Sequence, residues 1–334
     1  MNTAYSTWKT AYYAECGSEA YIKSTDPSKA VYAVSEGIGY GMLITAHLNK
    51  SNEFGKLWAF YKARKNSNGL MRWRYPSACT GSPTNGDNNS ASDADVDAAL
   101  ALIAAAKIFS NATYLADAKT LIAAIKKSEV ATNCSGSKSL LKPSDGWGGC
   151  DDLNPSYFAT GYFRLFGKVT SDSSFWDKVA TDSLALLATY QSKMNGQVPD
   201  WGKSDGTLGG ASHASGNTYG FEACRVPWRV AVDYGWYQTA DAKTFLTTMY
   251  KGILDENRPF FAIKPETQNS SMFVGGYATV GTGIDQATAD VYFSDWYLQR
   301  TLVGDSPVDA TTYFSNTLKM LYLITMGGRF DNGQ

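Results

Sequence analysis

The sequence has little charge, few histidines and no long apolar run. Only 18% of its 334 side chains are charged, where an average globular protein carries about 25%. No run of 18 apolar residues exists, so we expect no membrane-spanning helix. The 30 basic and 31 acidic side chains give a formal net charge of −1 without a basic stripe, so no nucleic-acid partner is expected. This composition also excludes a disordered tail, a coiled coil and a collagen-like repeat.

Patterns that bind metals are missing too. The two histidines and five cysteines form no CxxC pair, so we expect neither a zinc site nor another metal or cofactor. The odd number of cysteines permits at most two disulfides. A Cys134–Cys150 bridge would close a short loop in a secreted chain, but the sequence leaves the pairing open. We expect no signal peptide in this sequence, and the opening Met1-Asn2-Thr3 fits a trimmed mature end or an engineered start.

What the sequence has in abundance is aromatic side chains. It contains 15 Phe, 9 Trp and 21 Tyr, and Tyr and Trp combine a flat face with a polar edge. Together with low charge and many Gly, Ser and Asn, this composition suits a secreted protein that handles neutral polar ligands.

Hydrophobic periodicity predicts an all-helical chain with no convincing alternating strand. Ser35, Ser92 and Asn111 stand where N-caps belong, and Gly275-Gly276 argues against one long helix near the C-terminus. A domain with a single compact core rarely exceeds about 250–300 residues. A ring-shaped domain can be larger, because its core is annular. With no strong internal linker, we expect one domain over residues 1–334. The expected helices span 3–16, 35–49, 52–66, 92–110, 112–128, 154–168, 172–192, 221–237, 239–255, 269–281, 287–302 and 309–326.

The links between these helices alternate in length. Short links lie at 50–51, 111, 169–171 and 238, and long ones at 17–34, 67–91, 129–153, 193–220 and 256–268. Such alternation predicts helical hairpins stacked in a ring, with the long loops on one face. Loops longer than about 12–15 residues are usually functional or disordered. These carry Trp73, Trp147 and Trp201, which favours functional loops.

Three segments could carry chemistry. In Ser35-Glu36-Gly37-Ile38-Gly39-Tyr40-Gly41, Glu36 suits the helix dipole as a first-turn acid. Three glycines, however, each weaken a helix by about 1 kcal/mol relative to alanine. We therefore expect something to approach this helix end closely.

The second segment is Ala91-Ser92-Asp93-Ala94-Asp95-Val96-Asp97, where Asp93 and Asp97 form a like-charge pair four residues apart. No histidine lies nearby and the spacing is not that of an EF-hand, so the segment alone is ambiguous. In the third, Tyr219 to Arg229, Glu222 and Arg225 could form a simple helical ion pair, and Pro227 is tolerated in a first turn.

Together and in this order, the segments resemble glycoside hydrolase family 8, whose members are inverting, endo-acting enzymes folded as an (α/α)6 barrel. Ala91-Ser92-Asp93-Ala94-Asp95, with Ala99 and Phe109, resembles the family signature, although Ala98 stands where Ile or Met is usual. The resemblance extends through Gly327-Gly328-Arg329-Phe330. Further matching motifs are Leu70-Met71-Arg72-Trp73-Arg74 and Asn154-Pro155-Ser156-Tyr157-Phe158.

The resemblance implies a role for each matching residue. Glu36 would be the general acid that protonates the leaving oxygen, and Asp93 would hydrogen-bond sugar hydroxyls at the cleavage subsite. Tyr157 would help to position the attacking water. Trp73 and Trp147 would be platforms for sugar rings, although each tryptophan could instead belong to the core.

The general base is where the chain departs from the family pattern. Many members read Tyr-x-x-Asp-Ala-x-Arg, but Glu222 stands at the position of that Asp. A chitosanase-like branch has Asn there and takes a Glu from the preceding loop. The loop from 198 to 219 contains Asp200 and Asp205 but no Glu. We therefore expect Glu222 to be the base, with Arg225 orienting it and keeping it ionised.

The function this implies is an endo-β-1,4-glucanase that acts on cellulose or mixed-linkage β-glucan. An endo-β-1,4-xylanase ranks second. A chitosanase ranks lower, because a cationic polymer favours an acidic cleft and the loop glutamate is missing. Outside the enzymes, the chain could be a carbohydrate-binding protein that lost catalysis, or a helical-ring scaffold with an aromatic groove for protein. We expect a secreted monomer whose partner is a polysaccharide.

Overall fold

The computed structural model describes residues 1–24, 33–75, 79, 88–255, 271–294 and 312–333. The chain divides into two compact units. The first contains residues 1–129, 144–147 and 305–334, and the second contains residues 130–143 and 148–304. We describe each unit by itself.

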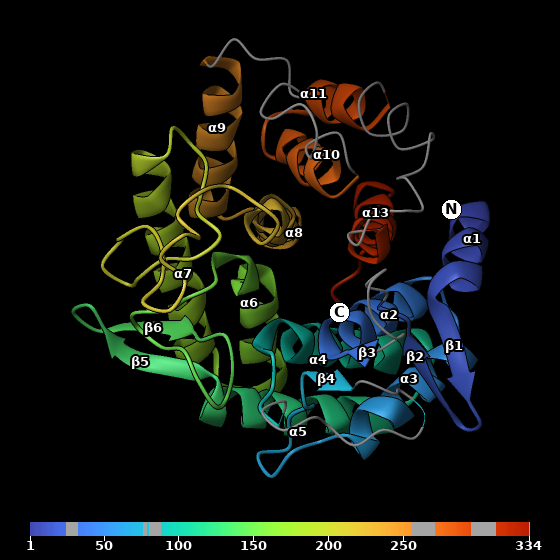
Figure 1. Ribbon diagram of the computed structural model, residues 1–334. Coiled ribbons are helices and arrows are strands. Elements are labelled where there is room, and N and C mark those ends of the chain that lie inside the picture. Colours follow the sequence, from blue (N-terminus) through green and yellow to red (C-terminus); the bar gives the residue numbers. More distant parts are fainter. Residues whose placement is uncertain (25–32, 76–78, 80–87, 256–270, 295–311, 334) are drawn as a thin grey trace. The chain divides into compact units, whose positions relative to one another are not determined.

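The first unit consists of helices and two short pairs of antiparallel strands (Figure 1). Strands β1 (Tyr13–Cys16) and β2 (Glu19–Ile22) form a hairpin, and β3 (Ala33–Val34) pairs with β4 (Arg74–Tyr75). The helices are α1 (Asn2–Tyr12), α2 (Ser35–His47), α3 (Ser51–Ala63), α4 (Ser92–Ile108), α5 (Ala112–Ser128) and α13 (Thr312–Met326).

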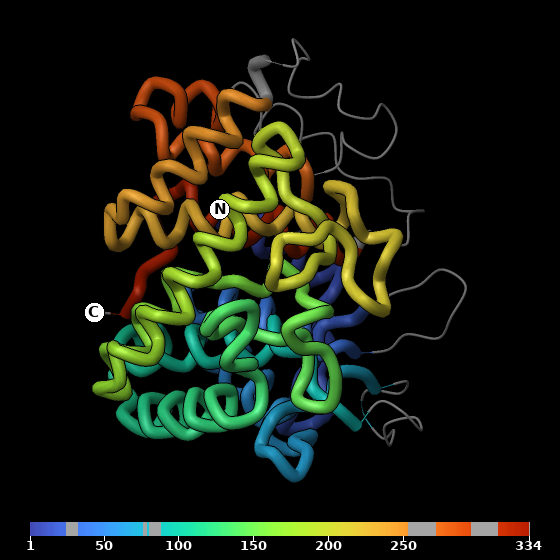
Figure 2. Tube along the Cα trace, turned by 90° about the vertical axis from the view of Figure 1, so that its left-hand side faces the viewer, coloured from blue at the N-terminus to red at the C-terminus, as the bar shows by residue number. Residues whose placement is uncertain are grey.

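Helices α2 and α4 form the interior of this unit. Every residue of α2 except Glu36 is buried, and so is every residue of α4 from Ser92 to Ala105. Helices α3 and α5 bury only one face each. Figure 2 shows α4 and α5 lying side by side in teal and green. Buried helices thus alternate along the chain with helices that cover them.

The glycines of α2 allow this close packing, as the sequence led us to expect. A Cβ atom on Gly39 would lie 2.9 Å from the carbonyl oxygen of Ala94 and 3.2 Å from its Cα. A Cβ on Gly41 would lie 2.7 Å from Ile22 of β2. Since the Ala94 atoms are backbone, they cannot rotate away, and only glycine lets the first turns of α2 and α4 approach this closely.

We therefore expect Gly39→Ala to lower the free energy of unfolding by about 1–3 kcal/mol, the usual penalty of overpacking a core. Gly235→Ala in α8 (Val226–Tyr237) is the matched control, because a Cβ there has no neighbour within 4 Å. The control should be neutral or slightly stabilising, since alanine favours helices. Urea unfolding measures both variants. Equal stability of Gly39→Ala and the wild type would contradict the packing argument.

The second unit repeats the pattern of buried and covering helices. Helices α6 (Thr160–Thr170) and α8 are largely buried, whereas α7 (Ser173–Lys193) buries one face and packs on both α6 and α9 (Ala240–Asp255). The remaining elements are the strand pair β5 (Val130–Cys134) and β6 (Lys138–Leu141), the helices α10 (Ser271–Ala278) and α11 (Gln286–Val291), and the 3₁₀ turns Pro155–Tyr157, Ala223–Arg225 and Thr279–Gly283.

Most expected helices are confirmed, and the errors lie at their ends. The helix expected over 3–16 ends at Tyr12, because residues 13–16 pair with β2. The helices expected over 154–168 and 221–237 begin only at Thr160 and Val226, each after a 3₁₀ turn. Helix α10 forms despite Gly275-Gly276. Within 287–302 the described α-helix ends at Val291, and residues 295–302 lie outside the described part, as do 256–268 and 269–270.

Two of the three expected N-caps are wrong. Asn111 caps α5, and its side chain accepts a hydrogen bond from the Thr113 N–H at 3.0 Å. Ser35 and Ser92 are instead the first helical residues, with Val34 and Ala91 before them. The Ser92 hydroxyl bonds to Glu129, which is a tertiary contact that the sequence does not reveal.

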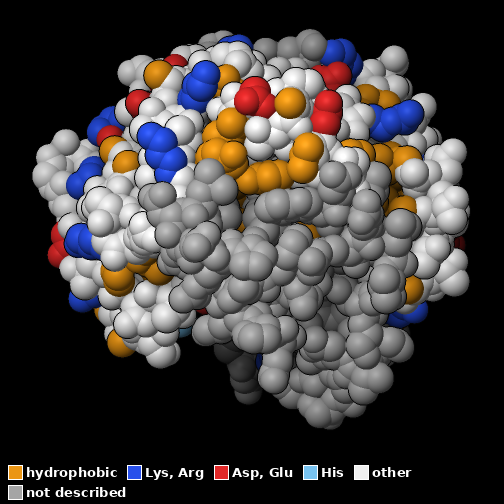
Figure 3. Space-filling model, turned by 90° about the horizontal axis from the view of Figure 1, so that it is seen from above, with side chains coloured by type: hydrophobic (Ala, Val, Ile, Leu, Met, Phe, Trp, Pro, Cys, Tyr) orange, Lys and Arg blue, Asp and Glu red, His pale blue; other side chains and the backbone are white. Residues whose placement is uncertain are grey.

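Two disulfides form, Cys16–Cys79 and Cys134–Cys150, and Cys224 is buried with a free thiol. The second bridge is the short loop closure anticipated for a secreted chain. In the described part of the chain, no helix has both the length and the apolar character needed to cross a membrane. Among the coloured side chains of Figure 3, lysines and arginines are scattered between uncharged ones, as the low charge of the sequence leads one to expect.

Candidate active site

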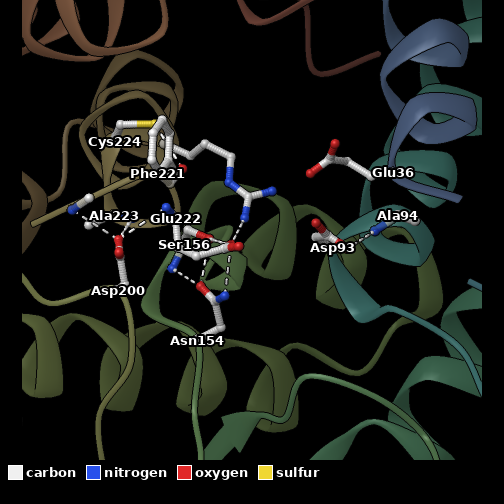
Figure 4. Close-up of polar contacts among 12 residues, drawn as sticks. Glu36, Asp93, Ala94, Asn154, Ser156, Asp200, Phe221, Glu222, Ala223 and Cys224 are labelled. Carbon is white, nitrogen blue, oxygen red and sulfur yellow. Dashed lines mark hydrogen bonds and ion pairs between the residues drawn. The ribbon is translucent and has the colours of Figure 1, made fainter. Parts of the chain in front are cut away.

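Two carboxyl groups project from helix starts in the first unit. Glu36 lies in the first turn of α2 and Asp93 in that of α4, and their side chains point to the same side (Figure 4). The close approach at Gly39 explains why the two first turns are neighbours. Asp93 is only 1% exposed, and its Oδ1 accepts a hydrogen bond from the Ala94 N–H at 2.8 Å. The Tyr313 hydroxyl of α13 donates to Glu36 Oε1 at 3.1 Å.

Trp73 is held beside the start of α2. Its carbonyl accepts from the Ser35 N–H at 2.8 Å, and its own N–H donates to the Asn89 carbonyl at 3.0 Å. The Arg74 guanidinium lies 4.7 Å from the centre of the Trp73 ring. Trp147 belongs to the same unit and is 40% exposed, which is unusual for so large an apolar side chain.

The second unit places Glu222 at the N-terminal side of α8, where two side chains donate to one oxygen of its carboxylate and a third lies near it. Arg225, which is 1% exposed, forms an ion pair with Glu222 Oε2. The Asn154 amide donates to the same oxygen at 2.8 Å, and the Ser156 hydroxyl lies 3.5 Å from it (Figure 4). Among the described residues, none is hydrogen-bonded to Oε1. The carboxylate is therefore fixed through one oxygen and leaves the other available.

Tyr157 completes this group. The Arg225 guanidinium lies 5.4 Å from the centre of its ring, so one buried arginine contacts both Tyr157 and Glu222. The 3₁₀ turn over Pro155–Tyr157 is fixed by Asn154, whose Oδ1 accepts from the Ser156 N–H at 3.0 Å. The structure thus brings three of the expected site residues together in this unit: Tyr157, Glu222 and Arg225.

Asp200 proves to be an anchor for the segment that carries Glu222. Its Oδ1 accepts hydrogen bonds from the backbone N–H groups of Gly220 and Glu222 at 3.0 Å and of Ala223 at 2.7 Å. Burial, with a smaller contribution from the charge of Glu222, raises the pKa of Asp200 to about 6, against the effect of these hydrogen bonds. Asp205, the other loop carboxylate, lies exposed in a turn where it accepts from the Thr207 N–H.

Several of these contacts could not be found from the sequence. Tyr313 lies 277 residues from Glu36, and Asp200 lies 20 to 23 residues from the N–H groups that it binds. No local pattern marks either residue. Asn154 and Ser156 stand within a motif that the sequence shows, but nothing in the motif indicates contact with Glu222.

Trp201, the third loop tryptophan, is already covered on one face. The His213 ring stacks on it with centroids 3.7 Å apart, and His213 Nδ1 lies 3.1 Å from Asp152 Oδ1. The described residues contain no group of three or more His, Cys, Asp or Glu arranged to hold a metal ion.

Comparison with known proteins finds similarity along almost the whole chain. The family model described as "Glycosyl hydrolases family 8" matches residues 1–328. Endoglucanase 2 of Ruminiclostridium josui is 33% identical over 99% of this chain and 72% of its own length. Endoglucanase A of Acetivibrio thermocellus is 32% identical over 99% of this chain and 70% of its own length.

Solved structures share the fold. A β-1,3-1,4-glucanase from Paenibacillus sp. X4 matches with a TM-score of 0.83 at 23% identity, over 98% of this chain and 91% of that one. A cold-adapted family 8 xylanase matches with a TM-score of 0.77 at 22% identity, over 99% and 91%. The likeness confirms the expected all-helical class, the (α/α)6 barrel.

Proposed function

Because this chain belongs to glycosyl hydrolases family 8, we propose that it is an endo-acting, inverting hydrolase of β-1,4-glucan, in cellulose or mixed-linkage β-glucan. The relatives named endoglucanases and the structural neighbour named a β-1,3-1,4-glucanase support this substrate class. Xylanases stand among the neighbours as well, so xylan is the second candidate.

The observation that carries the proposal is the state of the Glu222 carboxylate. Arg225 and Asn154 bind Oε2, which holds the group in place. A carboxylate that is held through one oxygen and has the other available can take a proton from water as a general base. We therefore assign Glu222 as the base and Tyr157 as a second hydrogen-bond partner of that water.

We assign the general acid to Glu36 in the first unit. The Tyr313 hydroxyl orients its carboxyl group through Oε1. Asp93, buried beside it on α4, would accept hydrogen bonds from the hydroxyls of the sugar that is cleaved. The loop from 198 to 219 supplies no second glutamate and its Asp200 already binds three N–H groups, which speaks against a chitosanase.

The setting we propose is extracellular. Two disulfides suit a protein that folds in an oxidising compartment. We further propose that residues 1–334 form one catalytic domain, that the protein is a monomer, and that it needs no metal or other cofactor.

Release of reducing ends from barley β-glucan, cellulose, xylan and chitosan tests the proposed substrate. We expect the highest rate on β-glucan, with a rapid fall in viscosity because an endo-acting enzyme cuts within chains. Hydrolysis of xylan alone would show that the chain is a xylanase and would contradict the proposed β-glucanase activity. Binding of oligosaccharides without any hydrolysis would indicate a carbohydrate-binding protein.

We expect Trp73→Ala and Trp147→Ala each to weaken cello-oligosaccharide binding about tenfold, or about 1.4 kcal/mol, because each removes a flat face on which a sugar ring can stack. Neither change removes a titratable group, so both limbs of the kcat/KM pH profile should stay in place. Trp236→Ala is the control, since Trp236 stacks on Tyr162 at the far end of α8. Calorimetric titration checks the affinities, and unchanged binding would return both residues to a structural role.

A further inference from the structure

Two carboxyl groups lie together in the interior of the first unit, next to the residues assigned to catalysis. Asp95 is in the first turn of α4 and Glu129 follows the last residue of α5. Both are 0% exposed. Among the described residues, neither has a lysine, arginine or histidine within ion-pair distance.

Each group is held by hydroxyl and backbone donors. Asp95 Oδ1 accepts from the Tyr61 hydroxyl and from the Met71 N–H at 3.3 Å. Glu129 Oε1 accepts from the Ser90 hydroxyl at 2.5 Å, and the Ser92 hydroxyl also bonds to Glu129. The two remaining oxygens, Asp95 Oδ2 and Glu129 Oε2, are buried and have no hydrogen-bond partner among the described residues.

The two carboxyl groups are neighbours, and each affects the pKa of the other. Ionised carboxylates only accept hydrogen bonds, so the buried Asp95 Oδ2 and Glu129 Oε2 can be satisfied together only if one of the two groups holds a proton. Burial is the main cause that raises the pKa of Asp95 to about 7 and the pKa of Glu129 well above its usual range, and the charge of Asp95 contributes to the rise at Glu129.

The neighbouring groups on the surrounding elements are Tyr61 of α3, Lys65 after α3, Asp93 of α4, and Asp145, which binds the Ser90 N–H. Burial and the charge of Asp95 raise the pKa of Tyr61 well above its usual value, so its hydroxyl remains a donor. The charge of Asp93 opposes ionisation of Asp95, whereas Lys65 favours it.

The donors of this pair connect the segments that carry the site. Met71 lies two residues before Trp73, whose carbonyl in turn binds Ser35 next to Glu36. Ser90 and Ser92 lie three residues and one residue before Asp93. The pair thus fixes the start of α4 and the segment that carries Trp73 relative to each other.

We propose that Asp95 and Glu129 share one proton and act as positioning residues for Asp93 and Trp73, so that loss of this proton at alkaline pH disorders the acid side of the active site. The proposal rests on the catalytic roles proposed above for Glu36 and Asp93. No bond is made or broken apart from that of the proton, which passes to the solvent as the pH rises.

The sign of the pH effect follows from proton binding. Unfolded carboxyl groups lose their protons near pH 4, whereas the folded pair keeps at least one. Between the pH at which the unfolded carboxyl groups lose their protons and the pH at which the folded pair loses its own, the folded state binds more protons than the unfolded state. The free energy of unfolding therefore falls as the pH rises. One additional proton lowers the folding equilibrium constant about tenfold for each pH unit.

Glu129→Gln is the decisive variant, because its amide oxygen can still accept from Ser90 and its NH2 group can donate to Asp95 without any titration. Between pH 5.5 and 7, the folding equilibrium constant of the wild type should fall with each pH unit by a factor about ten times larger than that of Glu129→Gln. The infrared carbonyl band of a protonated carboxylic acid should weaken at the same time. The alkaline limb of kcat/KM on β-glucan should move to higher pH, with activity at pH 5.5 within about threefold.

Asp182→Asn is the control, since this partly exposed carboxylate binds the Ser139 N–H and Lys178 and should change none of the three readouts. An unchanged infrared band and an unchanged slope in Glu129→Gln would overturn the shared proton. A changed slope with an unmoved alkaline limb would overturn the positioning role. If Glu129→Gln does not fold, Asp95→Asn tests the same proton, because its oxygen still accepts from Tyr61 and its NH2 can donate to Glu129.

The infrared and unfolding measurements need no substrate. They therefore test the pair even if the chain hydrolyses none of the four polysaccharides, and the failure of the proposed function can be told apart from the failure of this inference.

Discussion

Glu36→Gln is expected to lower kcat on β-glucan by at least about 10²–10⁴-fold, the usual contribution of general acid catalysis. The amide has the shape of the carboxyl group but cannot give a proton to the leaving oxygen. Its oxygen can still accept from the Tyr313 hydroxyl, so we expect the local geometry to persist. The free energy of unfolding and the affinity for cello-oligosaccharides should remain close to those of the wild type.

The structure offers a matched control for this variant. Glu53 is also a glutamate in the first turn of a helix, α3, where it pairs with Lys9 at 2.6 Å. Glu53→Gln should leave kcat within about twofold, because loss of one partly exposed ion pair changes stability by about 0–1 kcal/mol and touches no substrate. Initial rates and calorimetric titration measure both variants. Near-normal turnover of an unactivated polysaccharide by Glu36→Gln would remove Glu36 from the mechanism.

The parts of the fold that sequence reading predicts well are those whose cause is local. The run of glycines in α2 signals a close approach without revealing its partner, and the structure places the backbone of Ala94 there. The extended segment at residues 13–16 reads as helix in the sequence because four residues are too few to show a period of two. Its conformation comes from pairing with β2.

The same distinction applies to the candidate site. Glu36 and Asp93 stand in short motifs, so their positions at helix starts could be predicted, whereas Glu222, expected in a helix over 221–237, lies before the 3₁₀ turn Ala223–Arg225. The anchors Tyr313, Asp200 and Glu129 could not, since each acts on groups that lie far away in the chain and their surroundings arise only on folding. From the sequence, Asp200 could be proposed only as an alternative general base. In the structure, its Oδ1 accepts hydrogen bonds from three backbone N–H groups.

The base can be identified by comparing two isosteric changes. Glu222→Gln should lower kcat about 10²–10⁴-fold, because an amide cannot take a proton from water. Asp200→Asn should retain most of the activity, because an asparagine oxygen can accept the same three backbone hydrogen bonds. Glu222→Asp should keep part of the activity, since Arg225 can still pair with a shorter carboxylate. If Asp200→Asn is the inactive variant and Glu222→Gln the active one, the base is Asp200.

The stereochemistry of the product tests how Glu222 acts. If its Oε1 takes a proton from water, that water attacks the sugar and each cleavage of a β-linkage gives the α-anomer first. If Glu222 attacked the sugar itself, water would then release a product with the β configuration. Glutamate reaches about 1.5 Å further than the aspartate usual in the family, by one C–C bond, so both outcomes are chemically open. The ion pair with buried Arg225 and the hydrogen bond from Asn154 restrain the carboxylate and favour the role of a base. We therefore expect inversion, which proton NMR of the earliest products measures, and β-anomer formed before mutarotation would identify Glu222 as the nucleophile of a retaining enzyme.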